Sequence, residues 1–247
     1  MENVIAVMQR YELKYVLSLE QVNYLKEVLK DYMEIDKYGM TSIESLYYDT
    51  PNYRLIRESI EGMDFKEKIR LRSYGLNKPG KPVYLELKRK ADGVVYKRRI
   101  ETSPDKVDKF INYESDDLNQ GQISDEIKYF RDYYKSLVPS CLIIYDRVAY
   151  FERNGDLRLT IDYNPRYRLD NLNLDTSLEG KALLSDGGAI LEIKAQDSIP
   201  LWLCNILDRG KIYKSSFSKY GEAYRKEILN KRGVSNYVWS NIFKWII

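Results

Sequence analysis

The sequence alternates charged and apolar residues along most of its length, and this period of two limits the fold to one built mainly from strands. In one segment Lys68, Arg70 and Arg72 recur at every second position, with Ile69 and Leu71 between them. Similar patterns predict strands over residues 4–16, 43–48, 64–74, 82–90, 94–101, 140–152, 156–163 and 188–195. Strands of this kind are typical of an antiparallel sheet with one polar and one apolar face.

Turn and helix signals lie between these segments. The dipeptides Asp92-Gly93 and Asn154-Gly155 predict hairpin turns between neighbouring strands. Apolar residues at helical spacing predict helices after the capping box of Ser18 and Gln21, after Thr50-Pro51, after Ser124, after Pro200 and over about 219–231. We therefore predict an α+β fold, in which an antiparallel, closed or nearly closed β-barrel has helices packed outside.

One domain accounts for the whole chain. A length of 247 residues suits a single large domain. We expect this domain to span 1–247, with a core over about 4–230 and a C-terminal tail over 231–247. Residues 170–187 form the least patterned stretch, and we predict a loop there. The tail is hydrophobic, and we expect it to pack on the barrel in preference to a membrane or a partner.

Composition excludes several classes of chemistry. The chain has no histidine, which excludes phosphohistidine intermediates, Ser-His or Cys-His catalysis and His-ligated metals. Cys141 and Cys204 form no CxxC motif, and their apolar surroundings predict buried free thiols. The longest uncharged apolar run, 137–145, is too short to cross a bilayer. We expect a cytoplasmic protein whose formal net charge of +3 does not by itself predict nucleic-acid or membrane binding.

The charged strand faces are unusually basic. The predicted common faces carry Arg10, Glu12 and Lys14; Lys68, Arg70 and Arg72; Glu86, Lys88 and Lys90; Arg158, Thr160 and Asp162; and Glu192 and Lys194. Any one such face is explained by exposure to solvent. Repeated rows of like charge repel one another, however, so several of them together favour an enclosed bore filled by a polyanion.

Such a bore suits a chain of phosphates. Guanidinium and ammonium groups converging from several strands bind phosphate oxygens, and a few carboxylates among them suit Mg²⁺ or Mn²⁺. This combination supports in-line attack at phosphorus without a side-chain nucleophile, which agrees with the missing histidines. The sequence has no GxxxxGK[ST] motif, so a P-loop is excluded.

The chain resembles the VTC domain, the polyphosphate polymerase branch of the triphosphate tunnel metalloenzymes (CYTH-like superfamily). The resemblance starts at the strand Arg10-Tyr11-Glu12-Leu13-Lys14-Tyr15, which is similar to the ExK-type first strand of that superfamily. The supporting segments follow in family order: 47–50 (YYDT), 68–75 (KIRLRSYG), 85–90 (LELKRK), 145–150 (YDRVAY), 157–162 (LRLTID), 191–194 (LEIK) and 218–220 (SKY).

The resemblance implies an antiparallel eight-stranded closed barrel that forms a tunnel, and transfer of the ATP γ-phosphate to a growing polyphosphate chain. It implies catalytic phosphate contacts by Lys14, Arg70, Arg72, Lys88, Arg147, Arg158, Lys194 and Lys219. The expected substrate-binding residues are Arg10, Lys68, Lys90, Arg99 and Ser218. The expected ligands for Mn²⁺ or Mg²⁺ are Glu192 and Glu12. The implied partners are ATP and inorganic polyphosphate or triphosphate, with no nucleic acid and no transmembrane segment.

Two departures from the family pattern bear on the activity. Position 10 is Arg, whereas the hydrolase branch has an acid there, and this favours polymerisation over two-metal hydrolysis. Ser216 stands where another basic residue is expected. A triphosphate hydrolase of the same fold and a non-catalytic polyphosphate-binding module remain the alternatives.

Three carboxylates also have simpler interpretations than metal binding. Asp49 can cap the helix that follows Pro51, and Asp162 can pair with Arg158. Glu86 can orient a neighbouring base.

Overall fold

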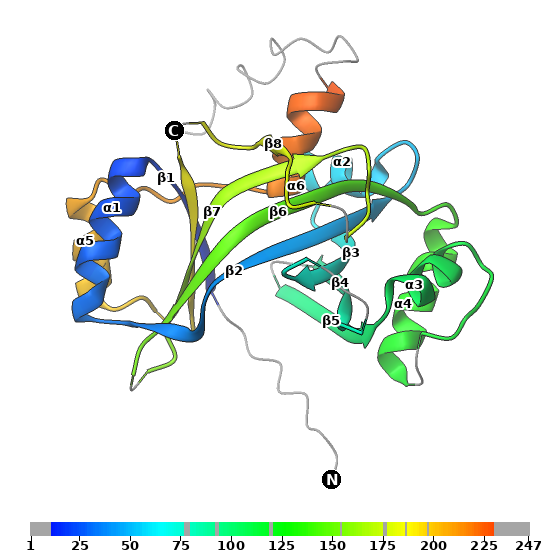
Figure 1. Ribbon diagram of the computed structural model, residues 1–247, viewed down its shortest axis with the longest axis horizontal. Coiled ribbons are helices and arrows are strands. Elements are labelled where there is room, and N and C mark those ends of the chain that lie inside the picture. The colour runs from blue at the N-terminus through cyan, green and yellow to red at the C-terminus, as the bar shows by residue number, and fades with distance from the viewer. Residues whose placement is uncertain are drawn as a thin grey trace.

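The protein is an α+β domain with one large antiparallel sheet, seen in the computed structural model of Figure 1. The structure describes residues 11–76, 80–91, 94–118, 121–153, 155–174, 177–185, 187–196 and 198–229. Eight strands follow one another in the order β1-β9-β7-β6-β2-β3-β4-β5, and a short strand, β8, pairs with β7. Their bounds are β1 Tyr11–Leu17, β2 Glu34–Asp49, β3 Lys66–Tyr74, β4 Val83–Ala91, β5 Val94–Thr102, β6 Val138–Phe151, β7 Arg158–Arg168, β8 Lys181–Ala182 and β9 Ala189–Ala195.

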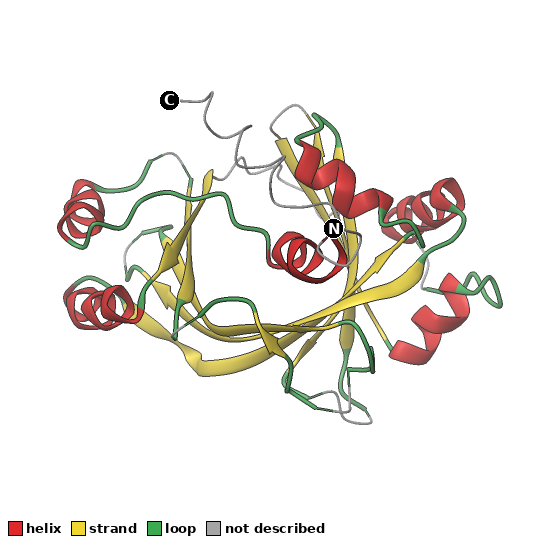
Figure 2. Ribbon diagram, turned by 90° about the horizontal axis from the view of Figure 1, so that it is seen from above, coloured by secondary structure: helices red, strands yellow, loops and turns green. Residues whose placement is uncertain are grey.

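The sheet is strongly curled but it is not the closed barrel predicted from the sequence. Strands β1 and β5 are the two ends of the strand order, and no ladder joins them in the part of the chain that is described (Figure 2). Side chains meet across this seam, because Lys88 Nζ on β4 lies 3.4 Å from Glu12 Oε2 on β1. Closure depends on strand stagger and tilt, which alternation along single strands does not determine.

The strand predictions are close in position but not always in length. Strands β3, β4, β5 and β9 begin and end within two residues of their predicted bounds. Strand β2 is the main exception, since it spans 16 residues and the prediction covered only 43–48. Its first half contains a register shift between Ile35 and Met40 and has Gly39 at φ 57°, and this irregularity breaks the alternation.

Helices cover both surfaces of the curled sheet. Their bounds are α1 Leu19–Val28, α2 Arg54–Glu61, α3 Pro104–Ile111, α4 Gln122–Tyr134, α5 Leu201–Arg209 and α6 Lys219–Tyr224, with short turns η1 Leu29–Asp31 and η2 Arg225–Leu229. Helices α1 and α5 lie at one end of the molecule, and α3 and α4 lie at the other (Figure 1). Helix α6 lies inside the curl (Figure 2), which differs from the prediction that all helices pack outside.

The sequence analysis missed helix α3. Ser103 caps it by accepting a hydrogen bond from the Lys106 N–H, and Pro104 stands at its first position. Val107 and Phe110 are fully buried beneath it. These are ordinary start and packing signals, so α3 could have been predicted from them.

Three apolar clusters hold the sheet and helices together. One packs α1 and α5 on β1, β9 and β7, and a second packs α3 and α4 on β3, β4 and β6, both on the convex side. The third joins α2 and α6 to the concave side through residues such as Tyr47, Tyr145 and Tyr220. Cys141 is a buried free thiol within this third cluster, and Cys204 is a free thiol that is only partly buried. No helix among the described residues is long and apolar enough to span a membrane.

Candidate functional site on the concave face

The concave face of the sheet gathers the charged residues that were predicted to share one surface. The apolar residues that alternate with them lie in the two clusters on the convex side. The charged side chains of the same strands therefore point to the concave side. The basic residues on the concave strand faces are Lys14, Lys68, Arg70, Arg72, Lys88, Lys90, Lys97, Arg99, Arg147, Arg158 and Lys194, and α6 adds Lys219 with Ser218. The carboxylates among them include Glu12, Glu86, Asp162 and Glu192. Arg10 lies outside the described residues.

Two arginines of β3 are held rigidly by neighbouring strands. Arg70 donates from Nε to Glu86 Oε2 at 2.9 Å and from Nη1 to the Tyr47 hydroxyl at 2.9 Å. Arg72 donates from Nε to Ser45 Oγ and from Nη2 to the Tyr145 hydroxyl, both at 3.3 Å. A guanidinium carries five N–H groups, so each arginine keeps donors for a ligand while its plane is fixed.

A pair of carboxylates lies on neighbouring strands β1 and β9. Lys14 Nζ lies 3.5 Å from both Glu12 Oε1 and Glu192 Oε1, and Arg147 Nη2 lies 3.6 Å from Glu192 Oε2. Burial acts to raise the pKa of Glu192, but a hydrogen bond with the Glu12 side chain and the positive charges of Lys14, Lys194 and Arg147 hold that pKa well below its usual range. The hydroxyl of Thr160, beside Glu192 in the β7–β9 ladder, is buried and has no hydrogen-bond partner among the residues that the structure describes.

This carboxylate pair fits a divalent cation that is shared with phosphate. The described residues contain no cluster of three or more His, Cys, Asp or Glu side chains able to enclose a metal. Mg²⁺, however, commonly binds through one or two carboxylates together with substrate phosphates and water. Glu192 and Glu12 therefore suit Mg²⁺ or Mn²⁺ bound with a phosphate chain, and the free Thr160 hydroxyl supplies a further oxygen beside them.

Asp162 forms a buried ion-pair cluster with β6 and α6. It is 0% exposed and accepts hydrogen bonds from Arg147 Nε at 2.5 Å and Nη2 at 2.8 Å, and from Lys219 Nζ at 2.5 Å. The suggested pairing with Arg158 is therefore wrong, because the β6 neighbour of Asp162 is Arg147, and Arg158 lies four residues before Asp162 at the start of β7. Lys219 also lies 4.4 Å from the centroid of the Tyr145 ring.

Lys68 has no carboxylate partner among the described residues. Its Nζ donates a hydrogen bond to Ser218 Oγ at 3.2 Å. Burial and the nearby charges of Lys14, Lys88 and Arg70 lower the pKa of Lys68 to about 8. Tyr47 acts in the opposite direction and raises this pKa, but its effect is outweighed. An ammonium group placed among other cations is stabilised best by an anion from solution.

Other cations line the margins of the concave face. Arg158 and Lys90 are exposed, and neither has an ion-pair partner among residues whose positions are described. Lys194 Nζ lies 3.7 Å from Glu192 Oε2. Arg99 packs its guanidinium 3.6 Å from the centroid of the Tyr84 ring.

Three residues of the site were not singled out from the sequence as site residues. Tyr47 and Tyr145 are the hydroxyl partners of Arg70 and Arg72, and Lys97 Nζ lies 2.8 Å from Glu86 Oε1. Tyr145 stands two positions before Arg147 on its strand, and this spacing indicates a shared face. Lys97 likewise stands two positions before Arg99, an expected substrate-binding residue, and this spacing indicates a shared face.

Asp49 caps a helix, as the simpler interpretation predicted. Its side chain accepts backbone hydrogen bonds from Thr50, Leu55 and Ile56 at 2.8–3.0 Å and another from the Tyr220 hydroxyl at 3.0 Å. Asp49 thereby joins the start of α2 to α6 and is not part of the phosphate-facing set.

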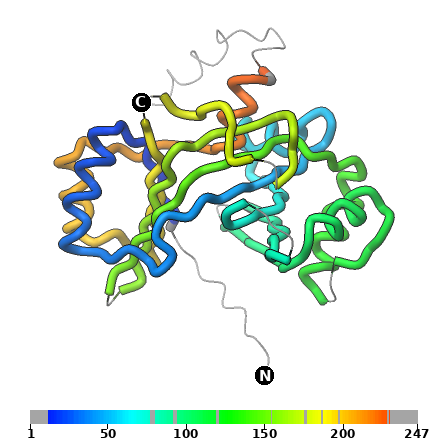
Figure 3. The backbone as a smooth tube through the Cα atoms, viewed as in Figure 1, coloured from blue at the N-terminus to red at the C-terminus, as the bar shows by residue number. Residues whose placement is uncertain are grey.

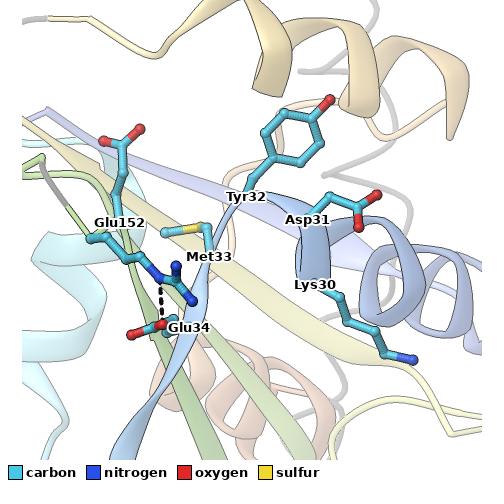
Figure 4. Close-up of a pocket in the computed structure, with 7 residues that line it drawn as sticks. Lys30, Asp31, Tyr32, Met33, Glu34 and Glu152 are labelled. Carbon is cyan, nitrogen blue, oxygen red and sulfur yellow. Dashed lines mark hydrogen bonds and ion pairs between the residues drawn. The ribbon is translucent and has the colours of Figure 1, made fainter.

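A separate surface pocket of about 390 Å³ lies away from this charged cluster (Figure 4). It is lined by Lys30, Asp31, Tyr32, Met33, Glu34, Glu152 and Arg153. Its two bases face three acids, and Arg153 pairs with Glu34 at 2.5 Å. This pocket lacks an excess of cations, so the concave face is the better candidate for an anionic ligand.

The fold is that of the triphosphate tunnel, or CYTH-like, proteins. A candidate adenylate cyclase from Bacillus halodurans superposes with a TM-score of 0.55 at 13% identity, over 84% of this chain and 92% of its own. HpAC1 from Hippeastrum, a candidate adenylyl cyclase with a dominant triphosphatase activity, superposes with a TM-score of 0.54 at 18% identity, over 86% and 93%. At these identities the likeness is one of fold.

The family assignment comes from the sequence. The model of the VTC domain matches residues 9–228, and the chain therefore belongs to the VTC domain family. This confirms the resemblance drawn from the strand motifs. A comparison with curated protein sequences gave no match.

Proposed function

We propose that this protein is a polyphosphate polymerase that transfers the γ-phosphate of ATP to a growing inorganic polyphosphate chain. The observation that carries the proposal is Lys68, a partly buried ammonium that faces other cations and has no carboxylate partner among the described residues. A phosphate chain along the concave face supplies the missing negative charge. Membership of the VTC domain family supports the same substrate class.

The concave face supplies what this reaction needs. A terminal oxygen of the polyphosphate chain attacks the γ-phosphorus, the bond from that phosphorus to the bridging oxygen breaks, and ADP leaves with the electron pair. Arg70, Arg72 and Arg147 are placed to neutralise phosphate oxygens as charge moves to the leaving group. A divalent metal held by Glu192 and Glu12 would add further neutralisation of the phosphate oxygens. No protein nucleophile is required.

A second candidate is hydrolysis of a triphosphate at the same site. The close approach of Glu12 to Glu192 favours it, because a carboxylate pair can place both a metal and an attacking water. The triphosphatase activity of HpAC1, which shares the fold, supports this second candidate. Water then replaces the polyphosphate terminus as the attacking group, and orthophosphate is released.

The products of ATP turnover distinguish the two reactions. Purified protein is incubated with ATP and Mn²⁺ or Mg²⁺, and long-chain polyphosphate, ADP and orthophosphate are measured together. Polymer formed in step with ADP supports the polymerase. Orthophosphate without polymer supports the hydrolase, and binding of polyphosphate without turnover indicates a non-catalytic module.

Neighbouring arginines of β5 provide a matched control. Arg99 lies on the concave face, whereas Arg98 lies on the convex face and donates to Glu126 Oε2 at 2.8 Å. We expect Arg99→Ala to weaken polyphosphate binding and Arg98→Ala to leave it unchanged. Equal effects of the two substitutions would contradict the placement of the substrate on the concave face.

A further inference from the structure

Glu86 is a buried carboxylate surrounded by cations. Its side chain is 2% exposed. Arg70 Nη2 lies 2.8 Å from Oε2, and Lys97 Nζ lies 2.8 Å from Oε1. Arg72 Nη1 and Arg99 Nη1 each lie 3.7 Å from one of the two oxygens. Four cations from strands β3 and β5 therefore share a single negative charge on β4.

This environment is unsuitable for a divalent metal. A metal ion at Glu86 would face four neighbouring positive charges, and Glu86 belongs to no cluster of three or more possible metal ligands among the described residues. The contrast is Glu192, which has Glu12 beside it. Burial acts to raise the pKa of Glu86, but the cations outweigh it and lower that pKa to about 2, so the carboxylate stays charged.

We infer that Glu86 is a resident counterion, which holds the four cations together when no phosphate is bound and so positions Arg70 and Arg72 for the substrate. The inference rests on the proposed function, because it assigns Glu86 a role toward the same phosphate chain. One carboxylate neutralises only part of the charge around it. The remaining positive charge attracts phosphate, while the carboxylate limits the repulsion that the empty site would otherwise contain.

The hydrogen bonds of the two arginines agree with this role. Glu86 accepts from Arg70 on one edge of the guanidinium, and the Tyr47 hydroxyl accepts on another. Arg72 is held by Ser45 and Tyr145 and only approaches Glu86. Removing the charge of Glu86 thus frees Arg70 and Lys97 most, since they make its shortest contacts.

The test compares Glu86→Gln with Glu192→Gln in thermal unfolding, with and without inorganic tripolyphosphate in the presence of a chelator. Without tripolyphosphate, we expect Glu86→Gln to melt at a lower temperature than the wild type. Adding tripolyphosphate should raise the melting temperature of Glu86→Gln by more than it raises that of the wild type. We also expect Glu86→Gln to bind tripolyphosphate about fivefold more tightly at low salt, because one competing charge is gone. Its Mn²⁺ requirement for turnover should match the wild type, whereas that of Glu192→Gln should rise.

The double variant Glu86→Gln with Lys97→Met guards against misfolding. It removes one positive and one negative charge, so it should recover much of the melting temperature lost in Glu86→Gln. A loss of stability that tripolyphosphate does not reduce, or a weakened Mn²⁺ response in Glu86→Gln, would overturn the counterion role. If tripolyphosphate fails to stabilise even the wild type, the proposed function fails as well, and that outcome differs visibly from a failure confined to Glu86.

Discussion

Lys68 provides the sharpest test of the candidate site, because its protonation must change when a polyanion binds. The pKa of Lys68 falls from 10.5 to about 8 through burial and neighbouring cations. A depression of this size corresponds to about 3 kcal/mol of unfavourable interaction for the ammonium. A bound phosphate chain supplies the missing counter-charge and returns the pKa toward its ordinary value. Replacing Lys68 by Arg keeps the positive charge but removes this titration.

The size of the effect follows from the two protonation states. At pH 8, about half of the Lys68 side chains carry a proton in the free protein, and nearly all carry one when the polyanion is bound. Binding at this pH therefore takes up about half a proton at Lys68. Tyr47 adds to the uptake: burial raises its pKa, but Arg70, Lys68 and Arg72 outweigh burial and lower it to about 8. A polyanion weakens their effect and favours the neutral phenol.

Isothermal titration calorimetry measures this uptake directly. Tripolyphosphate is titrated at pH 8, in the presence of a chelator, in two buffers that differ in ionisation enthalpy. The wild type should take up more protons than Lys68→Arg, and the double variant Lys68→Arg with Tyr47→Phe should take up fewer still. Equal uptake by the wild type and the double variant would refute the placement of the phosphate chain beside Lys68.

The same shift predicts how stability depends on pH. The pKa of Lys68 in the folded protein lies below its unfolded value, so the unfolded chain binds more protons between about pH 8 and 10. The contribution of Lys68 to the free energy of unfolding therefore rises with pH across this window. Urea denaturation of Lys68→Arg should show a smaller rise than that of the wild type, and the part that remains comes from groups such as Tyr47, whose pKa is also lowered on folding.

Three further substitutions test other parts of the site. Glu192→Gln should raise the Mn²⁺ or Mg²⁺ concentration needed for half-maximal turnover by about 10- to 100-fold, with little change in tripolyphosphate binding in a chelator, and a large loss of that binding would contradict a metal role. Asp162→Asn removes the carboxylate shared by Arg147 and Lys219, and should lower the free energy of unfolding by about 3 kcal/mol in urea titrations. No loss would mean that the cluster is not a stabilising one. Asp49→Ala removes a helix cap and should cost about 2 kcal/mol in the same assay, with kcat per folded molecule unchanged. A fall in that kcat would place Asp49 in the chemistry.

The strand faces could be predicted from the sequence because alternation is a local property. Lys68, Arg70 and Arg72 share a face whatever the neighbours of β3 are. Which charges meet across strands depends on register, which a single strand does not contain. Hence Arg158, on the same strand, was the partner suggested for Asp162 as an alternative to metal binding, although its partners come from β6 and α6.

The counterions and the closure of the sheet were the features least accessible from the sequence. Glu86 could be interpreted either as a metal ligand or as a residue that orients a base, and only the positions of β3 and β5 show that four cations surround it. The position of α6 inside the curl likewise depends on long-range contacts, including that of Tyr220 with Asp49.

The seam between β1 and β5 bears on how a polymeric substrate is handled. No β-ladder joins β1 to β5 among the residues described, and the outer edge of β1 pairs instead with the segment before α6, where the Ser215 N–H donates to the Lys14 carbonyl at 2.8 Å. On this side a long phosphate chain therefore meets one short connecting segment, which can move without breaking a ladder of the sheet. A fully closed ring of strands would instead oblige it to thread from one end.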